Sequence, residues 1–153
     1  MQVKDVMTAN PATCSPRTNL AAAAELMLDA DCGVLPVVEQ GKLIGIVTDR
    51  DMYVALATRD RRASELTVGD VACGDVYTCG PDDDVHSVLE MMKSHRVRRI
   101  PVAGFGGTVL GIVSLNDLVL AAGPRRPVRP DEVLGALQAI CAHHHPVAHV
   151  TAA

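Results

Sequence analysis

The chain of 153 residues has very few aromatic side chains: no tryptophan, one phenylalanine and two tyrosines. This scarcity argues against the stacking platforms on which single-stranded nucleic-acid binders rely. Lysine and arginine together number 14 against 18 acidic residues, and the resulting net charge of −4 gives no general attraction to nucleic acid. A nucleic-acid partner is therefore not expected.

Long apolar runs are also missing. No run reaches the roughly 20 residues that a membrane-spanning helix needs, and the opening stretch MQVKDVMTAN has no signal-peptide core. The five cysteines form no CxxC pair, which argues against a disulfide framework or a cysteine-rich zinc site. We therefore expect a cytoplasmic protein without membrane contact.

What the sequence does contain is an internal repeat. The matching segments are 13–16 with 78–81, 35–37 with 100–102, and 45–51 with 111–117. The first two pairs lie 65 positions apart, and the third lies 66 apart after a one-residue slip. An offset this constant in a chain without low complexity indicates two copies of one unit.

Each copy has the pattern of a mixed unit of helices and strands. The alanine-rich run 20–30 favours a helix with an apolar face. Two β-branched runs, 34–38 and 43–47, flank Gln40-Gly41 and predict a hairpin, after which a helix follows Thr48. The predicted unit is β-α-β-β-α, repeated from Tyr77 onwards, and the fold class is α/β (α+β).

This element order, with the ending Gly-hydrophobic-hydrophobic-Thr/Ser-x-x-Asp, resembles the cystathionine-β-synthase (CBS) domain, which occurs in tandem pairs called Bateman modules. The resemblance covers residues 1 to about 122, and the short layout is similar to the stand-alone hypoxic-response type of CBS protein. It implies CBS repeats at 1–65 and 66–122 related by pseudo-twofold symmetry. A Pro/Arg linker at 123–130 and a C-terminal helix and tail at 131–153 follow. It also implies a homodimer, and an adenine nucleotide or adenosyl ligand between the repeats.

The residues that end each copy support a nucleotide. Thr48 and Asp51 lie three positions apart where a strand is expected to pass into a helix, so their side chains share one side of the first turn. Ser114 and Asp117 repeat the pair. Backbone N–H groups at such a turn favour a phosphate, and a carboxylate accepts from both ribose hydroxyls. The same pattern is also close to a capping box that satisfies the helix itself; because both copies carry it, we favour ligand binding.

The two copies differ in charge where the second strand begins. Arg98 and Arg99 stand where the first copy has Gly33 and Val34. The resemblance implies that basic residues here reach phosphates, a role that suits the forked donors of arginine; the alternative is a solvated strand edge. Since the arginines belong to the second copy, we expect the site at Asp117 to bind more strongly than its equivalent.

The place of the adenine is implied by the resemblance alone. It points to main-chain groups near Ala12 and Tyr77, with Val6 and Val71 as apolar lining. These four positions complete the set of expected ligand-binding residues.

No catalytic residue is identified, because the chain has no Ser-His-Asp order, P-loop or GxGxxG motif, and we expect no enzyme. Residues 82–84, three aspartates, are typical of a helix start. A rival metal site is suggested by Cys141 with the histidines at 143–145 and 149, which are zinc or copper ligand types. Adjacent histidines at a chain end point in different directions, so no metal is assigned. Cys14 and Cys79 fit buried thiols better than redox groups.

Residues beyond the repeats predict an amphipathic helix. Asp131 is the expected cap, and Val133, Leu134, Leu137 and Ile140 form an apolar stripe. We expect this helix to cover the first copy or a second subunit.

Two classes of function follow. The first is a regulatory sensor that binds AMP, ADP, ATP or S-adenosylmethionine, requires no cofactor and signals to an unidentified protein. The second is a ligand-free interaction or redox module that acts through dimerisation, its thiols or its C-terminal tail. The sequence does not choose the nucleotide.

Overall fold

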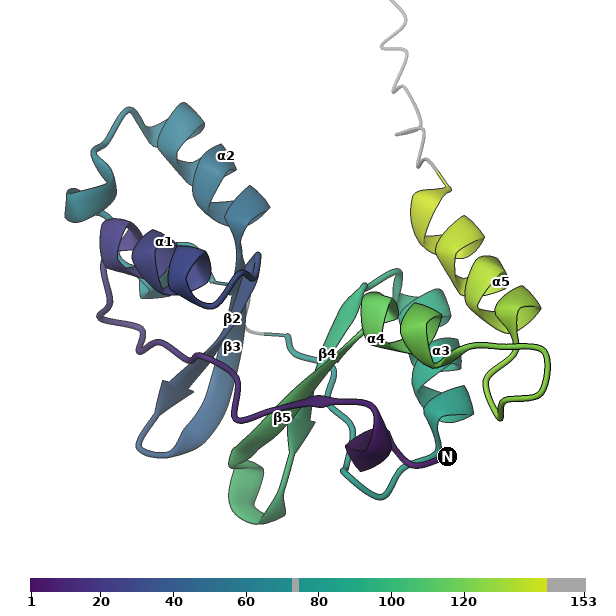
Figure 1. Cartoon of the computed structure of the whole chain (residues 1–153). Coiled ribbons are helices and arrows are strands. Elements are labelled where there is room, and N and C mark those ends of the chain that lie inside the picture. Colours follow the sequence, from purple (N-terminus) through teal and green to yellow (C-terminus); the bar gives the residue numbers. More distant parts are fainter. Residues whose placement is uncertain (73–74, 143–153) are drawn as a thin grey trace, which may run out of the picture.

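The computed structural model describes residues 1–72 and 75–142. Its helices are α1 (Leu20–Asp29), α2 (Asp49–Arg59), α3 (Val85–His95), α4 (Leu115–Ala121) and α5 (Pro130–Cys141). Its strands are β1 (Thr8–Ala9), β2 (Val34–Glu39), β3 (Lys42–Thr48), β4 (Arg99–Ala103) and β5 (Val109–Ser114). We call α1, β2, β3 and α2 repeat 1, and α3, β4, β5 and α4 repeat 2; Figure 1 shows both.

Each repeat is built around an antiparallel hairpin, as predicted. β2 pairs with β3 across the turn at Gln40 and Gly41, where both residues have positive φ, 50° and 77°. β5 pairs with β4 on one edge and β1 on the other, which gives a three-stranded sheet. The leading extended pieces are single parallel bridges from Cys14 to β2 and from Cys79 to β4.

Polar side chains fix where the helices begin. Asn19 accepts from the backbone N–H of Ala22 at the start of α1, and Asp84 accepts from that of His86 at the start of α3. The three-aspartate run is thus a helix start, as expected, and the part of the chain that is described contains no cluster of three metal-ligating side chains. Within the same residues, no helix is long and apolar enough to cross a membrane.

The segments that lead into the repeats are exchanged between them. Val3 is fully buried in the core of repeat 2, and its N–H donates to the carbonyl of Asp83 at 2.9 Å. Val68 is fully buried in the core of repeat 1, and its N–H donates to the carbonyl of Thr18 at 2.8 Å. Each repeat therefore completes its core with residues from the segment before the other, which ties the two together.

Glycine at position 111 allows the N-terminal segment to dock on β5. Ala9 pairs with Gly111 in the β1–β5 ladder. A Cβ at that position would lie 2.5 Å from the Sδ of Met7 and 3.0 Å from the carbonyl oxygen of Thr8. The close backbone approach thus requires a residue without a side chain.

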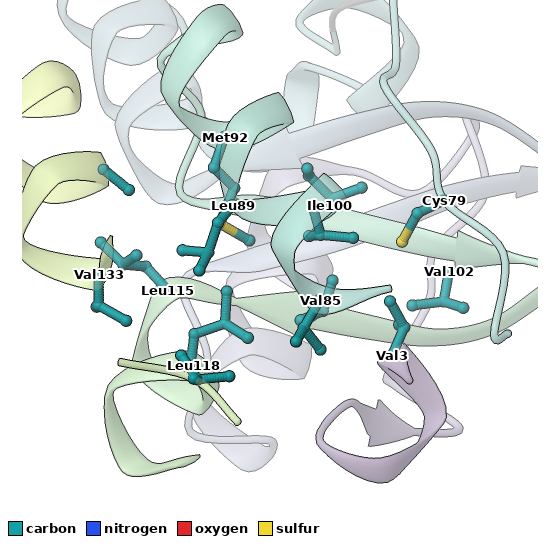
Figure 2. Packing of buried hydrophobic residues seen from close by; sticks show 14 residues of the cluster. Val3, Cys79, Val85, Leu89, Met92, Ile100, Val102, Leu115, Leu118 and Val133 are labelled. Atoms are coloured by element: carbon teal, nitrogen blue, oxygen red, sulfur yellow. The ribbon is translucent and has the colours of Figure 1, made fainter. Parts of the chain in front are cut away.

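The C-terminal helix packs on repeat 2. Val133 and Ala136 of α5 are buried with Val128 in the core formed by α3, α4 and the β4–β5 hairpin, part of which Figure 2 shows. The expectation that this helix covers repeat 1 or a second subunit is therefore wrong in its choice of repeat. Leu134, although part of the predicted stripe, stays 53% exposed.

The predicted cap of α5 is also wrong. Helix α5 begins at Pro130, and Glu132 accepts from the backbone N–H of Arg129 at 3.0 Å. Asp131 instead accepts two hydrogen bonds from the Arg129 guanidinium, both 2.9 Å. With proline at the first helical position, the cap is Arg129 and the helix starts two residues earlier than a cap at Asp131 would give.

Candidate functional site

A cleft of about 400 Å³, which we call cleft A, brings residues of both repeats together. Its lining residues are 8, 10–12, 30–34, 99, 112, 114, 116 and 117. Four of the residues expected to bind ligand are among them: Ala12, Arg99, Ser114 and Asp117. The volume lies in the range of small-molecule sites.

A second cleft of about 450 Å³, cleft B, is the pseudo-twofold equivalent of cleft A. Its lining residues are 34, 46, 48–50, 96–99 and 140. Thr48 stands where cleft A has Ser114, and Arg98 stands where cleft A has Gly33. Val34 and Arg99 line both clefts and so form the wall between them.

Each cleft combines the helix start of one repeat with the strand start of the other. Arg98, although it belongs to repeat 2, lies in cleft B with Thr48 of repeat 1. The expectation that both arginines strengthen the site at Asp117 is therefore wrong for Arg98, because the pseudo-twofold axis crosses the strands over. Arg99 contributes to both clefts: it pairs with Ser114 in the β4–β5 ladder and also lines cleft B.

The Thr/Ser-x-x-Asp motifs form capping boxes. Asp51 Oδ2 accepts from the Thr48 hydroxyl at 2.7 Å and from the Thr48 backbone N–H at 3.1 Å, while the Asp51 N–H donates back to Thr48 Oγ1 at 3.2 Å. Asp117 Oδ2 accepts from the Ser114 hydroxyl at 2.6 Å and from its backbone N–H at 2.7 Å. Both motifs thus stabilise the helices that they begin.

Capping leaves half of each carboxylate available. All these bonds go to Oδ2, and among the described residues no hydrogen bond reaches Oδ1 of Asp51 or Asp117. A carboxylate oxygen can accept two hydrogen bonds, so Oδ1 can serve a ligand without loss of the cap. The capping and ligand-binding interpretations are therefore compatible.

Backbone N–H groups at the start of α2 do not offer a phosphate site. The Asp49 N–H donates to the carbonyl of Gly33 at 3.2 Å, and the Arg50 N–H donates to Asp49 Oδ1 at 2.7 Å. Together with the Asp51 N–H, which donates to Thr48, the first turn is satisfied. Our expectation of a phosphate held by this helix start is wrong for α2, and side chains must supply the positive charge instead.

Two of the remaining expected residues, Val6 and Val71, lie in hollows that also hold the capping carboxylates. Val6 shares a side hollow with Asp117, and Val71 shares the equivalent hollow with Asp51. The Tyr77 ring stacks on His95 with centroids 3.7 Å apart and is not among the residues that line cleft B.

Among the lining residues of cleft B that the sequence reasoning did not assign to a site are Arg50, Arg96 and Ile140. Arg50 and Arg96 adjoin motifs that the sequence analysis singled out. Comparing them with the equivalent positions of the other copy would have shown that the copies differ there in charge. Ile140 had no such signal, because it comes from α5, outside the repeats.

The structure adds little support for the alternative sites, the thiols and the histidine-rich tail. Burial raises the pKa of Cys14 and of Cys79 to about 11, which keeps both thiols protonated and unreactive at neutral pH. The histidines at 143–145 and 149 lie outside the described residues.

Comparison with known proteins agrees with this architecture. A family model described as the CBS domain matches residues 3–58 and 68–123. CBS domain-containing protein YhcV of Bacillus subtilis is 36% identical over 118 residues, which cover 77% of this chain and 83% of YhcV.

Two solved structures are similar to this chain. The CBS domain pair of protein MJ0100, in complex with 5′-methylthioadenosine and S-adenosyl-L-methionine, is 28% identical, with a TM-score of 0.72 over 78% of this chain and 94% of that chain. Hypoxic Response Protein I with two coordinated zinc ions is 27% identical, with a TM-score of 0.72 over 80% of this chain and 100% of that chain.

Proposed function

Because this chain belongs to the CBS domain family and carries two copies of the domain, we propose that it is a regulatory module that binds an adenine nucleotide or adenosyl compound between its repeats. The observation that carries the proposal is the pair of capping carboxylates, Asp51 and Asp117, each with an unused Oδ1 at or beside a cleft. The MJ0100 pair, with its two adenosyl ligands, supports the same ligand class.

The chemistry of cleft A matches the parts of such a ligand. The Oδ1 of Asp117 accepts from the ribose hydroxyls. Ala12 and Val34 supply backbone and apolar surface for the adenine, and Arg99 is the one cationic side chain of the lining. The purine is thus recognised through backbone groups, with the aromatic side chains of Tyr77 and His95 engaged with each other.

Regulation follows from the position of the clefts between the repeats. A ligand that contacts both repeats stabilises the relative position of the repeats in which both walls of the cleft contact it. The size of this effect is set by how much more tightly the ligand binds that position than the alternative one. We propose that a partner protein in the cytoplasm reads this arrangement and that the chain itself catalyses no reaction.

The module is proposed to act as a homodimer. Helices α2 and α4 expose apolar side chains at equivalent positions, Val54 and Leu120, and α5 exposes Leu134 and Leu137. Apolar surface gathered on helices in this way is typical of protein contacts.

Titration calorimetry with AMP, ATP, S-adenosylmethionine and 5′-methylthioadenosine tests ligand binding. Asp51→Asn and Asp117→Asn keep an oxygen for the cap but replace the other with an amide, so affinity should fall about tenfold or more while stability is nearly kept. Asp70→Asn is the matched control, because Asp70 makes the same capping bonds to Thr67 (2.8 and 2.9 Å) away from both clefts. Absence of binding by all four compounds to the unmodified protein would refute the proposal.

The redox alternative is the weaker one. It would need a reactive thiol, and the two cysteines at equivalent strand positions, Cys14 and Cys79, are both buried with raised pKa. Reaction with an alkylating reagent at neutral pH distinguishes the two ideas, because rapid modification of Cys14 or Cys79 would favour the redox module.

A further inference from the structure

The two clefts are lined by equivalent segments of the two repeats but differ in the sign of their charge. Three pairs of equivalent positions differ: Arg50 against Asn116, Arg96 against Asp31, and Arg98 against Gly33, with the cleft B residue first. With Arg99 in the shared wall, cleft B is lined by four arginines and one aspartate, and cleft A by one arginine and two aspartates.

The arginines of cleft B are available to a ligand. None of the four forms an ion pair with a carboxylate among residues 1–72 and 75–142. The only hydrogen bond that their side chains make in this part of the chain joins Arg98 Nη2 to the Sγ of Cys141, at 3.8 Å. The four positive charges therefore line one cleft without being paired to carboxylates of the described residues, and such an arrangement attracts a polyanion.

The one acidic residue in the lining of cleft B, Asp49, offsets only one of the four arginine charges. Asp49 Oδ1 accepts from the backbone N–H of Arg50 at 2.7 Å. Its Oδ2 lies against Gly33: a Cβ added to Gly33 would be only 2.6 Å from this oxygen. The carboxylate is thus bound to backbone and lies against a residue of cleft A.

Cleft A has the opposite preference. Asp31 stands where cleft B has Arg96, and Gly33 offers no side chain to a phosphate. A triphosphate would meet the carboxylate of Asp31 with Arg99 alone to balance it, whereas a sulfonium or ammonium group would find a counter-charge.

We propose that the clefts sort adenosine-containing ligands by charge, with cleft B taking a nucleotide that carries several phosphates and cleft A taking an uncharged or cationic adenosyl compound. This inference rests on the proposed function and adds which ligand class each cleft takes. The chain would then read two different compounds at once, one on each side of the wall formed by Val34 and Arg99.

The experiment uses ATP and S-adenosylmethionine as probes of the full chain in calorimetry. We expect both to bind together without competition. Asp51→Asn, which alters the carboxylate bonded to Thr48 of cleft B, should weaken ATP alone, and Asp117→Asn should weaken S-adenosylmethionine alone. ATP affinity should also fall with added salt more steeply than that of S-adenosylmethionine.

Replacement of the cleft B arginines tests whether their charge is the cause. The double variant Arg50→Asn with Arg96→Asn alters two exposed side chains and should lower ATP affinity about tenfold, with S-adenosylmethionine unchanged. The converse variant Asn116→Arg should raise the ATP affinity of cleft A. Since these changes lie on the surface, an unchanged thermal melt shows that the fold is kept.

The outcomes separate this inference from the proposed function. If ATP and S-adenosylmethionine compete for one cleft, or if Asp51→Asn and Asp117→Asn weaken ATP equally, the sorting is overturned while ligand binding stands. If neither compound binds, the proposed function fails and the sorting fails with it.

Discussion

The guanidinium of Arg98 lies 3.8 Å from the Sγ of Cys141 and so joins the strand start of cleft B to the last turn of α5. Ile140, one residue earlier, is part of the lining of cleft B. A helix outside the two repeats therefore contributes a lining residue to cleft B and none to cleft A, and this asymmetry adds to the difference in charge.

Truncation of the Ile140 side chain should affect cleft B alone. Ile140→Ala removes apolar surface that a ligand would cover, so ATP affinity should fall by about fivefold, with S-adenosylmethionine unchanged. Leu137→Ala is the control, because Leu137 is on the same helix but does not line the cleft. Calorimetry on the two variants gives the answer, and equal losses for both ligands would show that α5 acts on stability rather than on cleft B.

The buried side of α5 should contribute to the stability of repeat 2. Val133 is only 5% exposed in a core with Leu118 and Met92, so Val133→Ala should lower the free energy of unfolding by roughly 2 kcal/mol. Leu134→Ala, on the exposed side, should change it by about 0.5 kcal/mol or less. Urea unfolding measures both, and similar losses would contradict the packing of α5 on repeat 2.

Gly111→Ala should loosen the N-terminal segment. The new Cβ would meet the carbonyl oxygen of Thr8 at 3.0 Å, and backbone must move to accommodate it. We expect a loss of about 1 to 3 kcal/mol and faster amide exchange in residues 3–9. Gly135→Ala in α5 is the opposite case: nothing lies within 4 Å of its Cβ, so it should stabilise by about 0.5 to 1 kcal/mol.

Stability should fall in alkaline solution because of the two buried thiols. Burial raises the pKa of Cys14 and of Cys79 from 9.0 to about 11. Between these values the unfolded chain loses protons that the folded chain keeps, so the stabilising contribution is complete below pH 9.0 and is lost as the pH rises towards about 11. Urea unfolding at about pH 8 and about pH 10.5 measures the loss, on the order of 2 kcal/mol per thiol at its limit.

A variant isolates the thiols from other groups that titrate in this range. Cys14→Ala with Cys79→Ala should be less stable at about pH 8 but should show a smaller drop between the two pH values. An equal drop in the variant and the unmodified protein would assign the pH dependence to other residues.

The repeat offset predicted the architecture well because local patterns determine most of it. The hairpin turn at Gly41, the helix start at Thr48 and the second copy of both could be derived from spacing and turn chemistry alone. The CBS fold and the grouping of Ser114 with Asp117 followed from the same pattern.

What the sequence could not predict depends on how the repeats meet. Val3 and Val68 are apolar and could be buried on either repeat. The sequence pattern therefore does not reveal that the two segments are exchanged. The pairing of Arg98 with Thr48 follows from the pseudo-twofold axis, which a comparison within one repeat does not reveal. Helix α5 has no counterpart in repeat 1, so nothing in the offset indicated what its apolar side covers.

The proposed homodimer has a candidate contact face on helices α2 and α4. Leu120 on α4 is 78% exposed, and its equivalent on α2 is the exposed Val54. If these faces form the contact, Leu120→Asp should place a charge in an apolar interface and shift the protein towards monomer in sedimentation, at concentrations where the unmodified chain is a dimer. Phe105→Asp is the control, since Phe105 is fully exposed in the turn between β4 and β5.

A third variant decides between the two candidate faces. Leu134→Asp tests the exposed side of α5, which the sequence assigned to the interface. Dissociation by Leu134→Asp alone would place the contact on α5, and dissociation by Leu120→Asp alone would place it on the helices of the repeats. In the second case the end of α5 remains accessible beside cleft B, so ligand binding there and dimerisation are expected to be independent.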